Sequence, residues 1–290
     1  MKTLYLDCFS GISGDMTIAA LLDTGVDVDY FENELKKLHL EEEYQLQFKR
    51  VNKNGISSFK FDVIFDDQPP HHDHDDNHGH SHHHHGHEHN HRHSHHHDHD
   101  HDHNHGHSHH HDHEHNHGHT HHHRTYKDIV TLIENSELNE TVKELSLRMF
   151  NVIGEAEAKI HGMKLDNVHF HEVGAIDSII DIVGTAILVD KLAVEKVVSS
   201  PVPTGSGRIS IDHGIYPVPA PATLEILKDV PLKNSDVKGE LTTPTGAAIV
   251  KVLAENFSES IPNMTVNQIG YGAGTKNFRE HPNILRVILG

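Results

Sequence analysis

Cysteine is almost absent from the sequence: Cys8 is the single one, so one chain cannot form an internal disulfide bond. No apolar run approaches the roughly 20 residues that a membrane-spanning helix requires. Near the start of the chain, Asp7 interrupts the apolar stretch after a few residues, which is not the pattern of a secretory signal peptide. We therefore expect a soluble, cytoplasmic protein with no membrane segment.

Basic residues are also scarce, because 24 Lys and Arg stand against 43 Asp and Glu, for a formal net charge of −19. Partial protonation of the 37 histidines offsets some of this charge. The acidic balance argues against nucleic acid as a partner, since nucleic-acid-binding surfaces are normally basic. The sequence also lacks the Gly-Lys-Ser/Thr ending of a P-loop, which argues against an ATPase-like phosphotransfer enzyme.

Histidine is abundant in one place only, because residues 71–123 hold 31 of the 37 histidines. A segment of His, Asp, Asn, Gly and Ser cannot bury a core, so we expect it to be disordered without metal. Imidazole suits nickel, copper and zinc, and the intermixed carboxylates add oxygen ligands. We expect several ions to bind at modest affinity, the alternative being a solvated linker; representative ligands are His95, His97, His99, His101 and His103.

The rest of the chain predicts alternating strands and helices. Strands are expected at 3–8, 43–51, 56–65, 167–174, 195–203, 265–274 and 283–290, the second and third joined by an Asn-Gly turn. Helices are expected at 16–25, 125–136, 139–162, 175–193, 219–229 and 243–257. The pattern predicts an α/β fold, a mixed sheet with packed helices, with α+β as the alternative. We expect 1–70 and 124–290 to form one domain that the histidine-rich insertion at 71–123 interrupts.

Residues 7–16 (DCFSGISGDM) join the first strand to a helix start through small residues. Backbone N–H groups at such a turn can bind an anion, and the hydroxyls and a carboxylate add polar contacts. The alternative is a tight turn in which Ser13 or Asp15 only caps the helix. The candidate substrate-binding residues here are Ser10, Gly11, Ser13, Gly14 and Asp15.

Residues 169–184 (HFHEVGAIDSIIDIVG) combine two histidines with three carboxylates. His169 and His171 point to the same side of an extended strand, and Asp177 and Asp181 share one helix face. Carboxylates on an otherwise apolar helix are costly to bury unless they are paired or metal-bound. We therefore predict a site here, with Glu172 as a further member, against the alternative of buried structural side chains.

Two more stretches carry candidate ligand contacts. Residues 201–223 are rich in glycine and proline, so we expect a structured loop, with Arg208 and His213 as possible contacts. Thr243 and Thr245 flank a proline at a helix start, where a phosphate or carboxylate could bind. A loop shaped only by its prolines and a simple threonine cap are the respective alternatives.

These stretches together resemble the blocks of a known family, the nickel-insertion proteins of nickel-pincer cofactor synthesis (the LarC family). The matching blocks are DCFSGISGDM, HFHEVGAIDSIIDIVG, PVPTG followed by HGIYPVPAPAT, ELTTPTGAA and GYGAGTKNF, in that order. The resemblance covers 1–66 and 124–290, and the family also carries a histidine-rich insertion of variable length.

The resemblance implies a nickel chelatase or cyclometallase of the lyase class. Its substrate would be pyridinium-3,5-bisthiocarboxylic acid mononucleotide, which gains two sulfur–nickel bonds and one carbon–nickel bond with release of protons. The family reaction depends on CTP with Mg²⁺ or Mn²⁺, and family members continue into a C-terminal domain linked to CTP. The implied partners are that domain or a second chain, and a lactate racemase-type apoenzyme that receives the product; a homo-oligomer is compatible with the sequence.

Roles for individual residues follow from this chemistry as hypotheses. His169, His171, Glu172 and His213 would be metal ligands that pass nickel on, because thiocarboxylate sulfur competes well against imidazole and carboxylate for Ni²⁺. The ring carbon must lose a proton, so a base is needed, and the catalytic candidates are Asp177, Asp181 and Glu172. The phosphate would bind at the Ser10–Asp15 turn, with Arg208, Thr243 and Thr245 as further substrate contacts.

Overall fold

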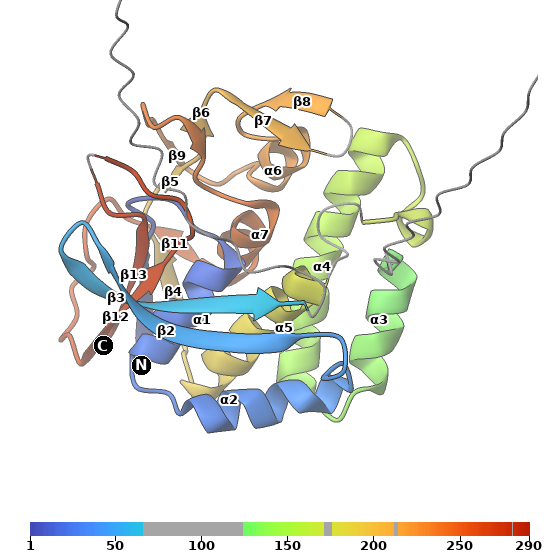
Figure 1. Ribbon diagram of the computed structural model, residues 1–290, viewed down its shortest axis with the longest axis horizontal. Helices are drawn as coiled ribbons and strands as arrows, with labels where there is room; N and C mark the ends of the chain where they lie inside the picture. The colour runs from blue at the N-terminus through green and yellow to red at the C-terminus, as the bar shows by residue number, and fades with distance from the viewer. Residues whose placement is uncertain (66–123, 171–175, 212–213, 280) are drawn as a thin grey trace, which may run out of the picture. The chain divides into compact units, whose positions relative to one another are not determined.

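A computed structural model describes residues 1–65, 124–170, 176–211, 214–279 and 281–290. The described residues on both sides of the histidine-rich segment contribute to one seven-stranded mixed sheet with strand order β11-β4-β1-β13-β12-β3-β2 (Figure 1). Its strands are β1 (Thr3–Asp7), β2 (Gln45–Lys53), β3 (Ile56–Ile64), β4 (Lys196–Ser199), β11 (Asn256–Phe257), β12 (Gln268–Ala273) and β13 (Ile284–Leu289). The predicted α/β fold class is confirmed.

The sheet contains both parallel and antiparallel strand pairs. β1 runs parallel to β4 and antiparallel to β13, and β12 joins antiparallel β13 to parallel β3. The β2–β3 hairpin turns at Asn54 and Gly55, whose φ values of 50° and 89° are those that a tight two-residue turn requires. The Asn-Gly signal in the sequence therefore predicted this hairpin correctly.

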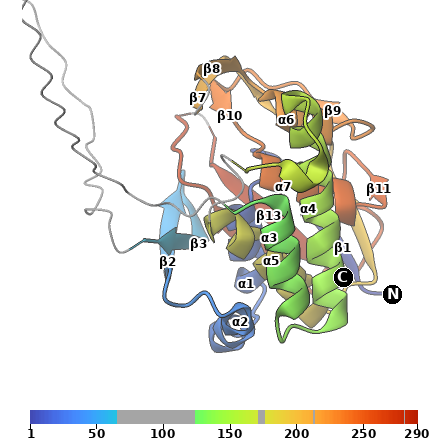
Figure 2. The ribbon, with the colours of Figure 1, turned by 90° about the vertical axis from the view of Figure 1, so that its right-hand side faces the viewer.

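The helices described are α1 (Gly14–Asp23), α2 (Val28–Leu35), α3 (Tyr126–Asn135), α4 (Glu140–His161), α5 (Ile176–Lys191), α6 (Pro221–Ile226) and α7 (Pro244–Leu253). α1 packs on β3, β12 and β13, and α5 lies against α1. α4 contacts α3, α5 and α7, and Figure 2 shows α3 and α4 side by side. No helix in the described part of the chain has the length and apolar character needed to cross a bilayer.

The two faces of the sheet are buried to different extents. Leu4, Leu6 and Val287 face the helices and belong to the main core. The alternate positions Tyr5 and Ile288 form, with Val198, a small second cluster on the other face, against which Met264 packs.

Helix α4 begins and ends where the sequence indicates. The side chain of Asn139 accepts a hydrogen bond from the amide of Val142, and Gly162 closes the helix with a left-handed backbone at φ 63°. α2 was not among the predicted elements, although Asp27 caps it by accepting from the amide of Asp29.

Two local predictions need correction. Within the described part of 167–174, His169 makes only an isolated bridge to Thr125, so no strand forms there. The strand-like pattern arises because Val168 and Phe170 are buried while His169 is exposed. The second correction concerns 201–223, which is not only a loop: it contains β5 (Val202–Pro203), β6 (Gly205–Ser206), β7 (Arg208–Ile211) and β8 (Gly214–Pro217), and β7 pairs antiparallel with β8.

Candidate functional site

The turn that follows β1 lies directly against the segment that enters α7. The amide of Ile12 donates to the carbonyl of Leu241 at 3.1 Å, and the amide of Thr243 donates to the carbonyl of Ile12 at 3.2 Å. Gly11 permits this contact, because a Cβ there would lie 1.9 Å from the Leu241 carbonyl oxygen. The first turns of α1 and α7 are therefore held side by side.

The first turns of α5 also reach this place. A Cβ on Gly14 would lie 2.3 Å from the Cβ of Asp181, so only glycine allows α1 and α5 to approach this closely. The backbone amide of Asp15 donates to the Asp181 carboxylate, which lies at the N-terminal end of α1. Three helix N-terminal regions, separated in sequence by up to 230 residues, thus share one site.

A cavity of about 400 Å³ opens between these helices, the strand β3 and the short strand β10 (Gly239–Glu240). Its lining combines carboxylates and hydroxyls with the apolar side chains of Phe61, Val63 and Pro244. The lining residues are Ser13, Asp15, Phe61, Asp62, Val63, Asp177, Ser178, Asp181, Glu240, Thr243, Pro244, Thr245 and Thr275. The arrangement suits a polar ligand that carries both anionic and cationic groups.

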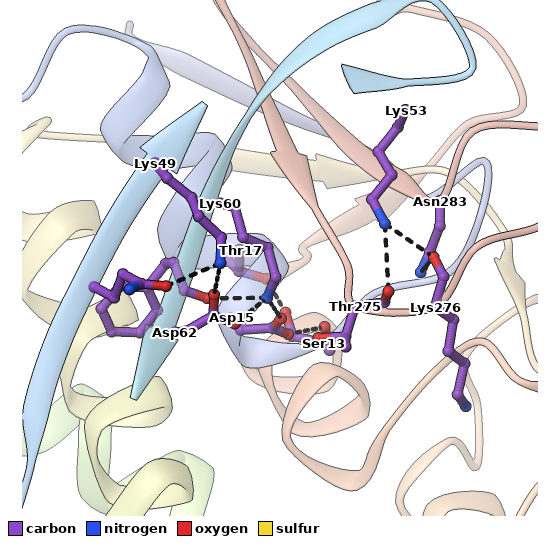
Figure 3. A network of polar contacts seen from close by, with 12 residues as sticks. Ser13, Asp15, Thr17, Lys49, Lys53, Lys60, Asp62, Thr275, Lys276 and Asn283 are labelled. Carbon is purple, nitrogen blue, oxygen red and sulfur yellow. Dashed lines mark hydrogen bonds and ion pairs between the residues drawn. The ribbon is translucent and has the colours of Figure 1, made fainter. Parts of the chain in front are cut away.

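A buried lysine connects two of these carboxylates. Lys60 on β3 extends its ammonium to Asp15 Oδ2 at 3.1 Å and to Asp62 Oδ1 at 2.5 Å (Figure 3). The hydroxyl of Ser13 donates to the other oxygen of Asp15. Lys49, on the neighbouring strand β2, approaches Asp62 Oδ2 at 3.4 Å. Charges of alternating sign therefore run from the cavity to the protein surface.

The pKa values of three groups in the site are shifted. Desolvation, followed by the charges of Asp15 and Asp177, raises the pKa of the Asp181 carboxyl well above its ordinary value. The Asp177 side chain is accessible through the cavity, yet desolvation by the surrounding protein raises its pKa as well. Burial alone would lower the pKa of Lys60, but Asp15 and Asp62 outweigh it and raise this pKa. Asp181 thus holds its proton more tightly than a solvent-exposed aspartate does, and Lys60 holds its own more tightly than a solvent-exposed lysine does.

The structure brings six of the sequence candidates together. Ser13, Asp15, Asp177, Asp181, Thr243 and Thr245 all line the cavity. Thr243 caps α7 by accepting from the amide of Gly246 at 3.2 Å, and its hydroxyl lies 2.9 Å from that of Thr245. Capping and exposure to the cavity are therefore compatible at Thr243.

Other substrate-binding candidates lie beside the cavity or away from its lining. Ser10 is buried and donates to the carbonyl of Pro282, so it holds the turn in place. Gly11 and Gly14 act through close backbone approach, as described above. Arg208 is exposed on β7 and is not among the lining residues. Asp7, at the end of β1, pairs with Arg286 instead of facing the cavity.

The predicted metal ligands are not assembled in the described part of the chain. His169 is exposed and does not line the cavity. His171, Glu172, His213 and the tract histidines lie outside the described residues. Among the residues that are described, no group of three or more His, Cys, Asp or Glu side chains is placed to hold a metal ion. The nickel ligands therefore stay a prediction.

Sequence reasoning missed the contribution of β3 and β10 to the site. Ser58, Lys60 and Asp62 alternate along β3 and so share one face of the strand. A lysine and an aspartate two residues apart, between phenylalanines and a valine, are the local signal that could have indicated this polar face. Glu240 carries no comparable signal, because only the pairing of β10 with β6 brings it to the cavity.

The fold and the cavity define an α/β protein with a polar, carboxylate-lined site at three helix N-termini. Comparison with known proteins gives the family: the model described as nickel insertion protein matches residues 4–290, and the chain belongs to this family.

The relatives are consistent in name. The pyridinium-3,5-bisthiocarboxylic acid mononucleotide nickel insertion protein of Geobacillus kaustophilus is 46% identical over 292 residues, which is 100% of this chain and 60% of the relative. The protein of the same name from Clostridium kluyveri is 45% identical and matches 100% of this chain and 62% of the relative. The chain thus spans about three fifths of the length of these relatives. No solved structure matches it.

Proposed function

We propose that the chain carries the substrate site for nickel insertion into pyridinium-3,5-bisthiocarboxylic acid mononucleotide, the compound named for its relatives. The observation that carries the proposal is a cavity in which hydroxyl-bearing helix starts meet several carboxylates. This combination matches a substrate with a phosphate at one end and a cationic ring at the other.

The dimensions and polar groups of the cavity support this substrate. A volume of about 400 Å³ lies within the range of small-molecule sites. Ser13, Thr243 and Thr245 stand at the starts of α1 and α7, where backbone N–H groups and the helix dipole favour a phosphate. The carboxylates of Asp15, Asp177 and Asp181 would face the pyridinium ring and the incoming Ni²⁺.

The chemistry requires a proton acceptor. Each turnover forms two sulfur–nickel bonds and one carbon–nickel bond, and the ring carbon gives up its proton as its electron pair binds nickel. Asp181 or Asp177, in its ionised form, would accept this proton, since a carboxylate whose pKa is raised is the stronger base. His169, His171, Glu172 and His213 stay our candidates for delivering nickel, with Arg208 as an additional substrate contact.

Further features of the activity follow from the family resemblance. We propose that insertion depends on CTP with Mg²⁺ or Mn²⁺ and on the region that the relatives possess and this chain does not span. The product would then pass to a lactate racemase-type apoenzyme. We expect the reaction to take place in the cytoplasm.

The direct test is mass spectrometry of the precursor incubated with Ni²⁺, CTP, Mg²⁺, this chain and the remaining region of the Geobacillus kaustophilus relative. We expect the mass of the nickel product with the wild-type chain and a loss of at least about tenfold in rate with Asp177→Asn or Asp181→Asn. Asp229→Asn is the matched control, because Asp229 is 94% exposed and does not line the cavity. Full activity in both cavity variants would refute the assignment of the base.

Nickel storage without catalysis is the second candidate, favoured by the 31 histidines of residues 71–123. Deleting this segment separates the two functions. If the chain inserts nickel, the deletion variant should lose activity only when nickel is scarce and regain it when nickel is saturating. If the chain only stores nickel, activity should not return at any nickel concentration.

A further inference from the structure

The ammonium group of Lys60 has no donor left for a substrate. An ammonium carries three N–H donors. Those of Lys60 have three acceptors: Asp15 Oδ2 at 3.1 Å, Asp62 Oδ1 at 2.5 Å and the carbonyl of Phe61 at 3.1 Å. Its side chain is only 7% exposed, although Asp15 and Asp62 line the cavity. Lys60 therefore acts on the cavity through its neighbours and not by contact with a ligand.

Asp15 links Lys60 to Asp181. The side chain of Asp15 binds Lys60 through one oxygen and the Ser13 hydroxyl through the other, while its backbone amide donates to the Asp181 carboxylate. Figure 3 shows the side-chain contacts of Asp15 with Lys60 and Ser13. Asp15 is therefore held through both its side chain and its backbone. Its side chain is held by a full positive charge and its backbone by the neighbouring carboxylate.

We propose that Lys60 is a positioning residue: held between Asp15 and Asp62, its charge makes Asp181 the carboxyl group that exchanges the reaction's proton. The proposal rests on the proposed function for the reaction, but the distribution of charge that it describes is a property of the chain alone. It concerns a residue of β3 that no sequence motif of the site contains.

The charged groups around Asp181 support this role. Asp15 on α1 and Asp177 on α5 disfavour its ionisation, whereas Lys60 on β3 favours it. Asp62 and Glu240 add negative charge to the cavity lining, and Lys49 offsets part of it from the surface side of Asp62. Charges interact more strongly in the protein interior than in water, so losing one buried cation changes this balance considerably.

The test is an infrared titration of the chain without substrate. The carbonyl stretch of a protonated carboxyl group, assigned to Asp181 by its disappearance in Asp181→Asn, is followed against pH. We expect Lys60→Met to raise the midpoint by at least about one pH unit, a tenfold gain in proton affinity. Lys60→Arg should restore the midpoint to within about 0.3 pH unit, because a guanidinium keeps the charge.

Lys49→Met is the matched control. Lys49 also pairs with Asp62, but its side chain is 49% exposed, so this variant removes an exposed positive charge instead of a buried one. It should leave the midpoint unchanged. Asp15→Asn gives a second test that does not depend on whether Lys60→Met folds. Removing the negative charge of Asp15 should lower the titration midpoint of Asp181, the opposite direction to Lys60→Met. An unchanged midpoint in folded Lys60→Met or in Asp15→Asn would overturn the proposal.

Activity measurements separate this inference from the proposed function. If both hold, the acid limb of the pH–rate profile for nickel insertion shifts upward in Lys60→Met by the same amount as the infrared midpoint, while KM is retained. If the wild-type chain with the complementing region inserts no nickel, the proposed function fails. The infrared titration then still decides whether Lys60 controls the proton on Asp181.

Discussion

Replacing Asp181 by asparagine should change how the stability of the protein depends on pH. The wild-type carboxyl lies against the N-terminus of α1, beside Asp15 and Asp177, and its pKa is raised chiefly by desolvation. Asparagine has nearly the same shape, can still accept the hydrogen bond from the Asp15 amide, and cannot ionise. The substitution therefore isolates the cost of charging this one partly buried group.

The sign of the effect follows from proton binding. Because the carboxyl has a higher pKa in the folded than in the unfolded protein, the folded state holds the proton over a pH range in which the unfolded state has released it. The free energy of unfolding then falls as pH rises through this range, by about 1.4 kcal/mol for each pH unit. The range begins near the ordinary aspartate pKa of about 4 and ends at the raised value.

Urea denaturation at a series of pH values measures the effect as the difference between Asp181→Asn and wild type. The histidine-rich segment is the same in both proteins, so its titration cancels in the difference. We expect the two proteins to be similar near pH 4 and the variant to become progressively more stable as pH rises, until a plateau is reached. A difference that is flat with pH, or that favours wild type more at high pH, would refute a raised pKa at Asp181.

Three further predictions concern the same region. Gly14→Ala should destabilise the protein by about 1–3 kcal/mol, because its Cβ would overlap the Cβ of Asp181. Adding Asp181→Gly to this variant should recover part of the lost stability in the same denaturation assay. If the stability changes of the two substitutions simply add, the contact is contradicted. Thr243→Val should cost about 1 kcal/mol through loss of the α7 cap, whereas Thr243→Ser should cost little; equal losses would exclude capping as the cause. Burial raises the pKa of the Cys8 thiol to about 12, so the native protein should resist thiol reagents at pH 8 and react only once unfolded; rapid reaction of the native state would contradict this.

Much of the fold could be predicted from local patterns in the sequence. Asn54-Gly55 predicted the β2–β3 hairpin, and Asn139 with Gly162 marked the two ends of α4. Each of these signals acts within a few residues, through a turn conformation or a cap, so the rest of the chain is not needed to interpret it.

Two departures show where local patterns are insufficient. Val168 and Phe170 alternate with an exposed His169 as in a strand, but their burial comes from packing, Phe170 against Tyr126 and Phe150. The β7–β8 hairpin formed within a segment whose glycines and prolines predicted a loop. In both places the backbone pairing depends on neighbours that the local sequence does not specify.

By itself, the sequence determined which short stretches carry polar groups at helix starts: 10–15, 177–181 and 243–245 each combine a helix signal with carboxylates or hydroxyls. Only the tertiary structure decided that these stretches meet in one cavity, and that Lys60 lies between Asp15 and Asp62 within it. The reason is that caps and turns are local interactions, whereas the cavity depends on sheet order and on close helix approach between segments far apart in the chain.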